Sequence, residues 1–168
     1  MPFQIGRFWN IAFALLFSVT AVSAAEYLEH VEGYKPCMLC YEGRIPHYLG
    51  IPLLMGALEL YRKGLHIHFT AAPAALFYLY GVGLSIYHAG AEWKFWEGPT
   101  SCGAINLKAG VSAADLLQAI QSTPVVSCTE PALRFMGLSL AGMNGLVCGL
   151  IVALLVSAML LKRHPSAF

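Results

Sequence analysis

Charged side chains are scarce in this 168-residue chain, of which only 11% are Asp, Glu, Lys or Arg. The formal net charge is +1 at pH 7 and no basic stripe is present, which argues against nucleic-acid binding. The sequence also lacks internal repeats, low-complexity tracts and any stretch resembling a separate soluble domain. We therefore expect a single domain spanning residues 1–168.

Apolar residues make up 58% of the chain, and the mean hydropathy is +0.64, which is typical of a membrane protein. Because a bilayer core needs about 20 residues of helix, the nearly charge-free runs are candidate spans. These runs predict an all-α membrane protein built as a four-transmembrane-helix bundle, with spans at residues 8–25, 45–61, 69–89 and 135–161. The second run is the weakest, because Pro52 should kink it and His47 is polar. The first run also resembles a secretory signal, but it is long for one, and we expect it to be retained.

Short basic segments set the expected orientation. Arg7, the pair Arg62 and Lys63, and the pair Lys162 and Arg163 flank span ends, which places both termini in the cytoplasm. Residues 26–44 and 90–134 then form two loops on the outer side. Within the longer loop, residues 112–121 have a capping-box-like start and one apolar face, and they predict a short amphipathic helix. Packing of that helix within the loop is an equally ordinary interpretation.

Four of the five cysteines fall on the outer side in this topology, which is where oxidising compartments lie. Cys37 and Cys40 form a Cys-x-x-Cys pair at the edge of the second span, and Cys102 and Cys128 lie in polar segments of the longer loop. Cys148 is surrounded by apolar residues in the fourth run and is expected to serve only in packing. A zinc site needs four ligands placed close together, and neither the loop cysteines nor the outer histidines show such a repeat, so no metal is expected.

The spacing of Cys37 and Cys40 favours redox chemistry, because a disulfide across two residues closes a small, strained ring that is easily reduced. Arg44 follows Cys40 by one helical turn and is predicted to favour a thiolate or to hydrogen-bond a cofactor carbonyl. An arginine at a membrane edge can equally be a snorkelling residue. His88, near the end of the third span, is either an interfacial histidine or a polar group of the same site. Static disulfides that brace the loops remain the alternative to a redox relay.

Together these motifs resemble the DsbB family of bacterial inner-membrane proteins. The resemblance covers nearly the whole chain and includes "PCMLCYEGR" before the second span, "YHAG" at the end of the third, a cysteine pair in the longer outer loop and "MGLSLAGMNGL" entering the fourth. Gly43 departs from the Gln or Glu that the family usually has before the arginine. This departure leaves the details of quinone affinity open.

The resemblance implies a membrane thiol oxidase of the bacterial inner membrane, with its active cysteines on the periplasmic side. Such an enzyme reoxidises a periplasmic DsbA-like thioredoxin-fold protein and passes two electrons to a membrane quinone, either ubiquinone or menaquinone. It also implies that the partner attacks a Cys102–Cys128 disulfide at Cys102, and that Cys128 then exchanges with Cys37 while Cys40 reacts with the quinone. Arg44 and His88 match positions on the quinone side.

Two other function classes fit parts of the pattern. A four-span structural or adaptor protein would need its loop disulfides only for bracing. A vitamin K epoxide reductase-like oxidoreductase also has a loop pair and a Cys-x-x-Cys, but there the Cys-x-x-Cys follows the loop pair. In this chain it precedes the loop pair, which argues against that class.

Overall fold

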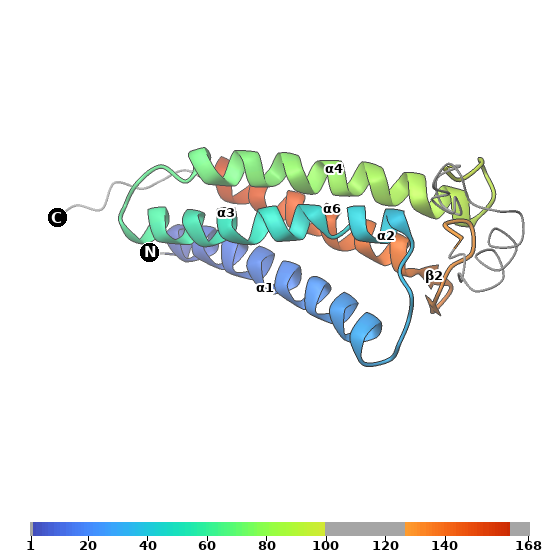
Figure 1. Ribbon diagram of the computed structural model, residues 1–168. Coiled ribbons are helices and arrows are strands. Elements are labelled where there is room, and N and C mark those ends of the chain that lie inside the picture. The colour runs from blue at the N-terminus through green and yellow to red at the C-terminus, as the bar shows by residue number, and fades with distance from the viewer. Residues whose placement is uncertain (1, 100–126, 162–168) are drawn as a thin grey trace, which may run out of the picture.

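Helices dominate the part of the chain described by the computed structural model, which comprises residues 2–99 and 127–161. Its long helices are α1 (Pro2–His30), α3 (Ile45–Arg62), α4 (His68–Glu92) and α6 (Leu140–Leu160), and they lie side by side (Figure 1). The short helix α2 (Met38–Glu42) precedes α3. Two short antiparallel strands, β1 (Arg134–Phe135) and β2 (Leu138–Ser139), precede α6. The fold is therefore mostly helical, as the sequence predicts.

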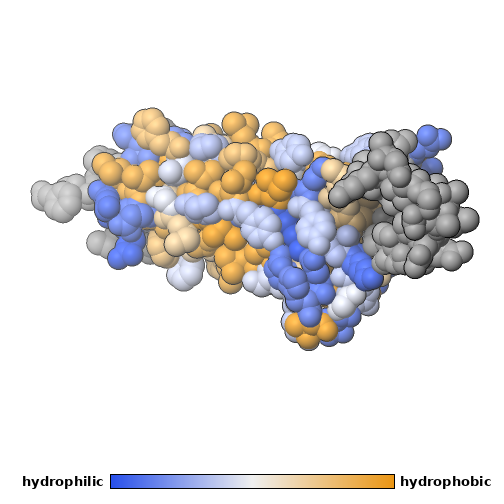
Figure 2. Space-filling view, viewed as in Figure 1, coloured by the Kyte–Doolittle hydropathy of each residue, from blue (hydrophilic) through white to orange (hydrophobic). Residues whose placement is uncertain are grey.

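Three helices in the described part of the chain are long and apolar enough to cross a membrane, namely Gly6–His30 of α1 together with α4 and α6. Helix α3 does not join this set, because it carries His47, Pro52 and Glu59 within only 18 residues. The surface agrees with a membrane setting. Figure 2 shows apolar side chains over the middle of the molecule and polar ones gathered towards both ends. Large exposed apolar residues include Leu16, Met55, Leu76, Leu79 and Leu146.

Side chains from all four long helices form one buried core. Ile11, Leu54, Tyr78 and Ile151 are essentially inaccessible and belong to the same apolar cluster. A Cβ at Gly50 of α3 would lie 2.2 Å from the Tyr78 hydroxyl oxygen, so only glycine lets α3 approach α4 this closely. This close approach fixes the start of α3, and with it the neighbouring cysteine segment, against α4.

Several helix boundaries differ from the predicted span limits, including the start of α1 at Pro2 and the end of α4 at Glu92, and two of them have a clear cause. Helix α1 continues past residue 25 to His30, because Glu26 and Glu29 point their polar groups towards partners beyond the apolar run. Helix α6 begins at Leu140 rather than at residue 135, since Met136 and Gly137 both adopt positive φ and form the turn of a β-hairpin. The predicted amphipathic helix at residues 112–121 lies outside the described residues.

A polar clamp joins the start of α1 to the end of α6, in addition to their apolar packing. The Arg7 guanidinium donates to the carbonyl oxygens of Ala158 (2.7 Å) and Leu161, at the C-terminal end of α6. Carbonyl groups at the C-terminal end of a helix need partners from outside its regular hydrogen bonding, and a cationic side chain there is favourable. Towards its opposite end, α1 diverges from the other long helices (Figure 1). The space opened by this divergence adjoins the Cys-x-x-Cys segment.

Candidate functional site

The Cys-x-x-Cys pair forms the first turn of α2. Cys37 is the N-cap, with extended backbone, and its sulfur accepts a hydrogen bond from the backbone N–H of Cys40 at 3.4 Å. The two Sγ atoms are 3.0 Å apart, and both cysteines are free thiols in this structure. Cys37 is buried and Cys40 is partly exposed. The turn geometry thus places the two sulfurs within reach of disulfide formation.

His88 and Glu92 of α4 lie against this pair. The Nε2 atom of His88 is 3.6 Å from the Sγ of Cys37 and 3.7 Å from Oε1 of Glu92. The two α4 residues are one helical turn apart, and both are buried. His88 therefore belongs to the thiol site, one of the two placements that the sequence left open. Glu92 was not predicted as a site residue. Its position one helical turn after His88 indicates that the two side chains can lie side by side, and this spacing is visible in the sequence.

The thiols have opposite acid–base character. The hydrogen bond donated by Cys40 lowers the pKa of Cys37, burial opposes this effect, and His88 reinforces it. The same hydrogen bond, together with burial and the charge of Cys37, raises the pKa of Cys40. Cys37 is thus the thiolate of the pair at neutral pH, while Cys40 holds the shared proton.

Cys128 packs against the same pair. It is 1% exposed and forms a buried apolar cluster with Cys37 and Leu39, flanked by Cys40 and Leu84. Cys128 is disulfide-bonded. Cys102 lies outside the described residues. The structure therefore brings three of the four predicted site cysteines together, although 88 residues separate Cys40 from Cys128 in the sequence.

Arg44 lies between α2 and α3, with its guanidinium turned towards α1. Its Nη1 donates to Glu26 at 2.9 Å and to Glu29, and the guanidinium carbon lies 5.1 Å from the centre of the Tyr41 ring. The side-chain hydroxyl of Tyr41 donates to Glu29 as well. Arg44 thus ties the diverging end of α1 to the cysteine segment. The side chain that contacts Cys37 is the imidazole of His88, whereas Arg44 pairs with two carboxylates of α1. Of the roles expected for Arg44, a contact with a cofactor carbonyl stays a prediction.

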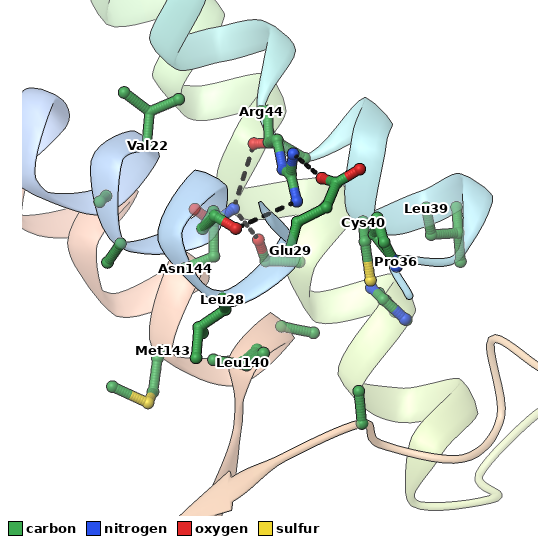
Figure 3. Close-up of a pocket in the computed structure, with 18 of the residues that line it drawn as sticks. Val22, Leu28, Glu29, Pro36, Leu39, Cys40, Arg44, Leu140, Met143 and Asn144 are labelled. Atoms are coloured by element: carbon green, nitrogen blue, oxygen red, sulfur yellow. Dashed lines mark hydrogen bonds and ion pairs between the residues drawn. The ribbon is translucent and has the colours of Figure 1, made fainter. Parts of the chain in front are cut away.

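A cavity of about 210 Å³ opens between the end of α1 and the starts of α3 and α6. Its walls are mostly apolar and include Val22, Leu28, Leu84, Leu140 and Met143. The residues with polar side chains in its lining are Glu29, Tyr34, Lys35, Cys40, Arg44, His47, Ser85, His88 and Asn144. In Figure 3, Arg44 and Glu29 lie on one side of the cavity, and Cys40 lies beside Leu39 and Pro36 on another. An apolar chamber with a thiol in its wall suits a flat, lipid-soluble ligand.

The chain is similar to proteins of one known family. Residues 7–158 match the DsbB family, described as Disulfide bond formation protein DsbB. The chain belongs to the DsbB family. It is 31% identical to Disulfide bond formation protein B of Albidiferax ferrireducens, over 99% of this chain and 98% of that protein. It is also 28% identical to the uncharacterized protein RP370 of Rickettsia prowazekii, over 91% of this chain and 86% of that protein. No solved structure gives a significant match.

Membership of the DsbB family identifies the chain as a disulfide bond formation protein of a membrane, with disulfide oxidoreductase activity in general. The three helices long enough to cross a bilayer fit a multi-pass membrane protein. The predictions of family and of membrane class are thereby confirmed. The free thiol pair on α2 and the disulfide at Cys128 are the groups in the described residues suited to this chemistry.

A polar network in the core of this DsbB-family protein was missed at the sequence level. Nε2 of His47 lies 2.9 Å from Oδ1 of Asn144, and the Ser18 hydroxyl lies 3.0 Å from Nδ1 of His47. The Tyr78 hydroxyl then donates to the oxygen of Ser18 at 2.7 Å. Asn144 also donates to Ser85 at 3.0 Å. A single amide in the most apolar helix was the available signal, because polar groups at membrane depth are costly unless partnered.

The shifted pKa values predict a pH profile for alkylation of this DsbB-family protein. Because the pKa of Cys37 is lowered, its thiolate persists as pH falls from 8 to 6, whereas an ordinary thiol loses about tenfold in rate per pH unit. Cys40 should stay unreactive over that range. Iodoacetamide labelling of the reduced chain, with each site quantified by mass spectrometry, measures both rates. Cys40→Ala removes the donor to Cys37 and should move its profile to higher pH. A Cys37 rate that falls tenfold per unit in the unmodified chain would contradict the assignment.

Proposed function

We propose that this chain is a membrane thiol oxidase that reoxidises a periplasmic DsbA-like thioredoxin-fold protein and delivers two electrons to a membrane quinone. The observation that carries the proposal is the position of the thiol pair. Cys37 faces the buried cluster with Cys128, and Cys40 lines the apolar cavity. The Cys37–Cys40 pair therefore adjoins both Cys128 and the mostly apolar cavity.

The sulfur order follows from these positions. We infer that the reduced partner attacks Cys102 and releases Cys128 as a thiolate. Cys128 then attacks Cys37 of the oxidised Cys37–Cys40 pair (the edge pair) and releases the thiolate of Cys40. The second thiol of the partner attacks the disulfide between the partner and Cys102, so that the partner leaves oxidised and Cys102 becomes a thiolate. Cys102 then attacks Cys128 and releases Cys37, which restores the Cys102–Cys128 disulfide. Each exchange forms one S–S bond and breaks another, so no external redox agent is needed until the electrons leave the edge pair. Packing of Cys128 against Cys37 supports this route.

The cavity residues fit a quinone. The walls are mostly apolar, and the cavity adjoins the end of α1, where lipid-soluble molecules can approach. A quinone bound there would supply the two-electron acceptor. Arg44 keeps its positive charge at every physiological pH and can donate to an acceptor oxygen, while His88 and Asn144 offer further polar contacts in the same wall.

We also propose the topology that the basic residues predict. It has four spans in a single domain over residues 1–168, both termini in the cytoplasm and the cysteines on the periplasmic side. The placement of α2, the end of α4 and the start of α6 at one end of the bundle supports a common side for the thiols (Figure 1). Helix α3 would then be the shortest span, with its polar ends in the interface.

Reconstitution tests the function directly. The purified full-length protein in detergent is mixed with a reduced DsbA-like protein and ubiquinone-1 or a menaquinone analogue, and quinone absorbance and partner thiols are followed together. We expect one quinone reduced per disulfide formed in the partner. Cys37→Ser should abolish both signals, whereas Cys148→Ser should leave them unchanged. Partner oxidation that continues at full rate without any quinone would refute the assignment of the acceptor.

A further inference from the structure

We propose that the dithiol form of the edge pair is a binding site for a zinc ion, with Cys37, Cys40, His88 and Glu92 as its ligands. The sequence offers no zinc-binding repeat, because His88 and Glu92 lie about fifty residues beyond the cysteines. The fold removes this separation. One ligand atom each from Cys37, Cys40 and His88 lies within 4.8 Å of the other two.

The spacing of these atoms approaches that of a tetrahedral site. With Zn–S bonds of about 2.3 Å and a Zn–N bond of about 2.0 Å, tetrahedral angles place sulfur and nitrogen about 3.5 Å apart. The measured distance from Cys37 Sγ to His88 Nε2 is 3.6 Å. The same bond lengths need the two sulfurs about 3.8 Å apart. They stand at 3.0 Å here, so a rotation of the partly exposed Cys40 side chain is the adjustment required.

Glu92 supplies an independent observation that points to a cation. Its side chain is only 5% exposed, and its Oε2 atom is buried with no hydrogen-bond donor among the described residues. Its other oxygen lies 3.7 Å from Nε2 of His88. A buried carboxylate oxygen left without a partner is costly, because its water has been removed and nothing replaces it. A metal ion beside His88 would satisfy it.

The donor set selects the class of ion. Two thiolates, an imidazole and a carboxylate match the ligands that Zn²⁺ takes, whereas Mg²⁺ and Ca²⁺ prefer oxygen ligands throughout. The second grouping of possible ligands, Glu26, Glu29 and His30, differs in kind. Both of its carboxylates are already paired with Arg44, and His30 is exposed, so we assign it no ion.

Binding would depend on redox state, because only the dithiol can provide two thiolate ligands. A disulfide between Cys37 and Cys40 removes both. Because a ligand stabilises the state that binds it, zinc would stabilise the reduced Cys37–Cys40 pair. Its thiolates would then be unavailable for disulfide exchange. This site concerns the resting dithiol alone, and it stands whether or not the electrons pass to a quinone.

Cobalt(II) is the probe, since its complexes with thiolates absorb through sulfur-to-metal charge transfer and tetrahedral coordination intensifies its visible bands. The full-length chain carrying Cys102→Ser and Cys128→Ser is reduced with a phosphine, freed of reductant and titrated with Co²⁺ without oxygen. We expect one Co²⁺ per chain, a charge-transfer band, and its loss when one equivalent of Zn²⁺ is added. Oxidising the edge pair should prevent the band. The titration needs neither partner protein nor quinone, so its result is separate from that of the reconstitution.

Three variants decide the ligand set. Cys40→Ser should abolish most of the charge-transfer band, and Glu92→Gln should weaken Co²⁺ binding at least tenfold. Glu130→Gln, which alters an exposed carboxylate paired with Lys94, is the matched control and should leave binding unchanged. If Glu92→Gln loses its helical circular dichroism, His88→Gln carries the same tenfold criterion. The proposal is overturned if the reduced chain gives no charge-transfer band. It is also overturned if Glu92→Gln, or His88→Gln where Glu92→Gln does not fold, binds Co²⁺ as tightly as its parent.

Discussion

Replacing Cys128 with alanine is expected to stop turnover, by about a thousandfold or more, and to leave the partner protein attached to Cys102. Removing one member of a set of groups that react in sequence costs nearly as much as removing them all. In this variant the Cys102 thiolate attacks the disulfide of an oxidised partner, and one partner sulfur leaves as a thiolate. Cys128 is then missing as the thiol that would release the partner from Cys102. A reducible adduct should therefore appear on non-reducing gels of cells expressing the variant.

Two comparisons make the trapping result specific. Cys128→Ala, Cys102→Ser in one chain should give no adduct, since the attacking sulfur is gone. Cys148→Ala removes a thiol that is buried in the core at 0% exposure and should preserve both turnover and the absence of adduct. If Cys128→Ala gives no adduct, and the wild-type cysteines stay oxidised in cells deprived of quinone, the relay is wrong and static bracing disulfides describe the protein better.

Replacing Arg44 with alanine is expected to lower the rate of quinone reduction by about tenfold to a hundredfold, with thiol exchange between the partner and the loop cysteines unchanged. The reason is positional. Arg44 lines the cavity and holds α1 to the cysteine segment through Glu26 and Glu29, whereas Cys37 contacts His88. Without the guanidinium, two carboxylates at the cavity edge lose their cation and an acceptor oxygen loses a donor. Stopped-flow quinone absorbance and acid-quenched partner thiols measure the two steps separately.

Conservative and distant substitutions sharpen this test. Arg44→Lys keeps the charge but lacks the planar pair of donors, so it should recover only part of the lost rate. Arg62→Ala removes an exposed arginine at the far end of α3 and should have no effect on either step. An equal loss of quinone reduction and of partner exchange in Arg44→Ala would contradict the role assigned to this residue. It would mean that the substitution disrupts the packing of the cysteine segment as a whole.

Periodicity and residue type were enough to predict a helical membrane protein and to single out the thiol pair and the neighbouring Arg44. They were not enough to place helix ends. The apolar run that includes Phe135 looks continuous with the fourth span, yet positive φ at Met136 and Gly137 turns the chain into a hairpin. Ser139 then caps α6 by accepting from the N–H of Gly142. Such local turn chemistry competes with hydrophobic pattern, and composition does not reveal which prevails.

The contacts of the site depended on tertiary packing. Arg44 follows Cys40 closely in the sequence, so it was expected to favour a thiolate of the pair or to hydrogen-bond a cofactor carbonyl beside it. Packing instead brings it to Glu26 and Glu29 of α1, and places His88 of α4 against Cys37. Asn144 was passed over for the same reason, since its partner His47 lies on another helix. Glu92 pairs with His88 of its own helix, but the burial of both residues beside Cys37 is visible only in the fold. Which ion pairs form between helices depends on which helix faces meet, and the spacing of residues in one sequence does not reveal those contacts.

The clamp between Arg7 and the end of α6 has a mechanical consequence. The clamp holds α1 near its N-terminus, and the Arg44 ion pairs hold Glu26 and Glu29 near its C-terminus. From Arg7 to Glu29 the arm is roughly 33 Å long at about 1.5 Å per residue. At that length, a tilt of about two degrees about the clamp would displace Glu29, which lines the cavity, by about 1 Å. The angle of α1 would therefore set how far Glu29 stands from the facing wall of the cavity.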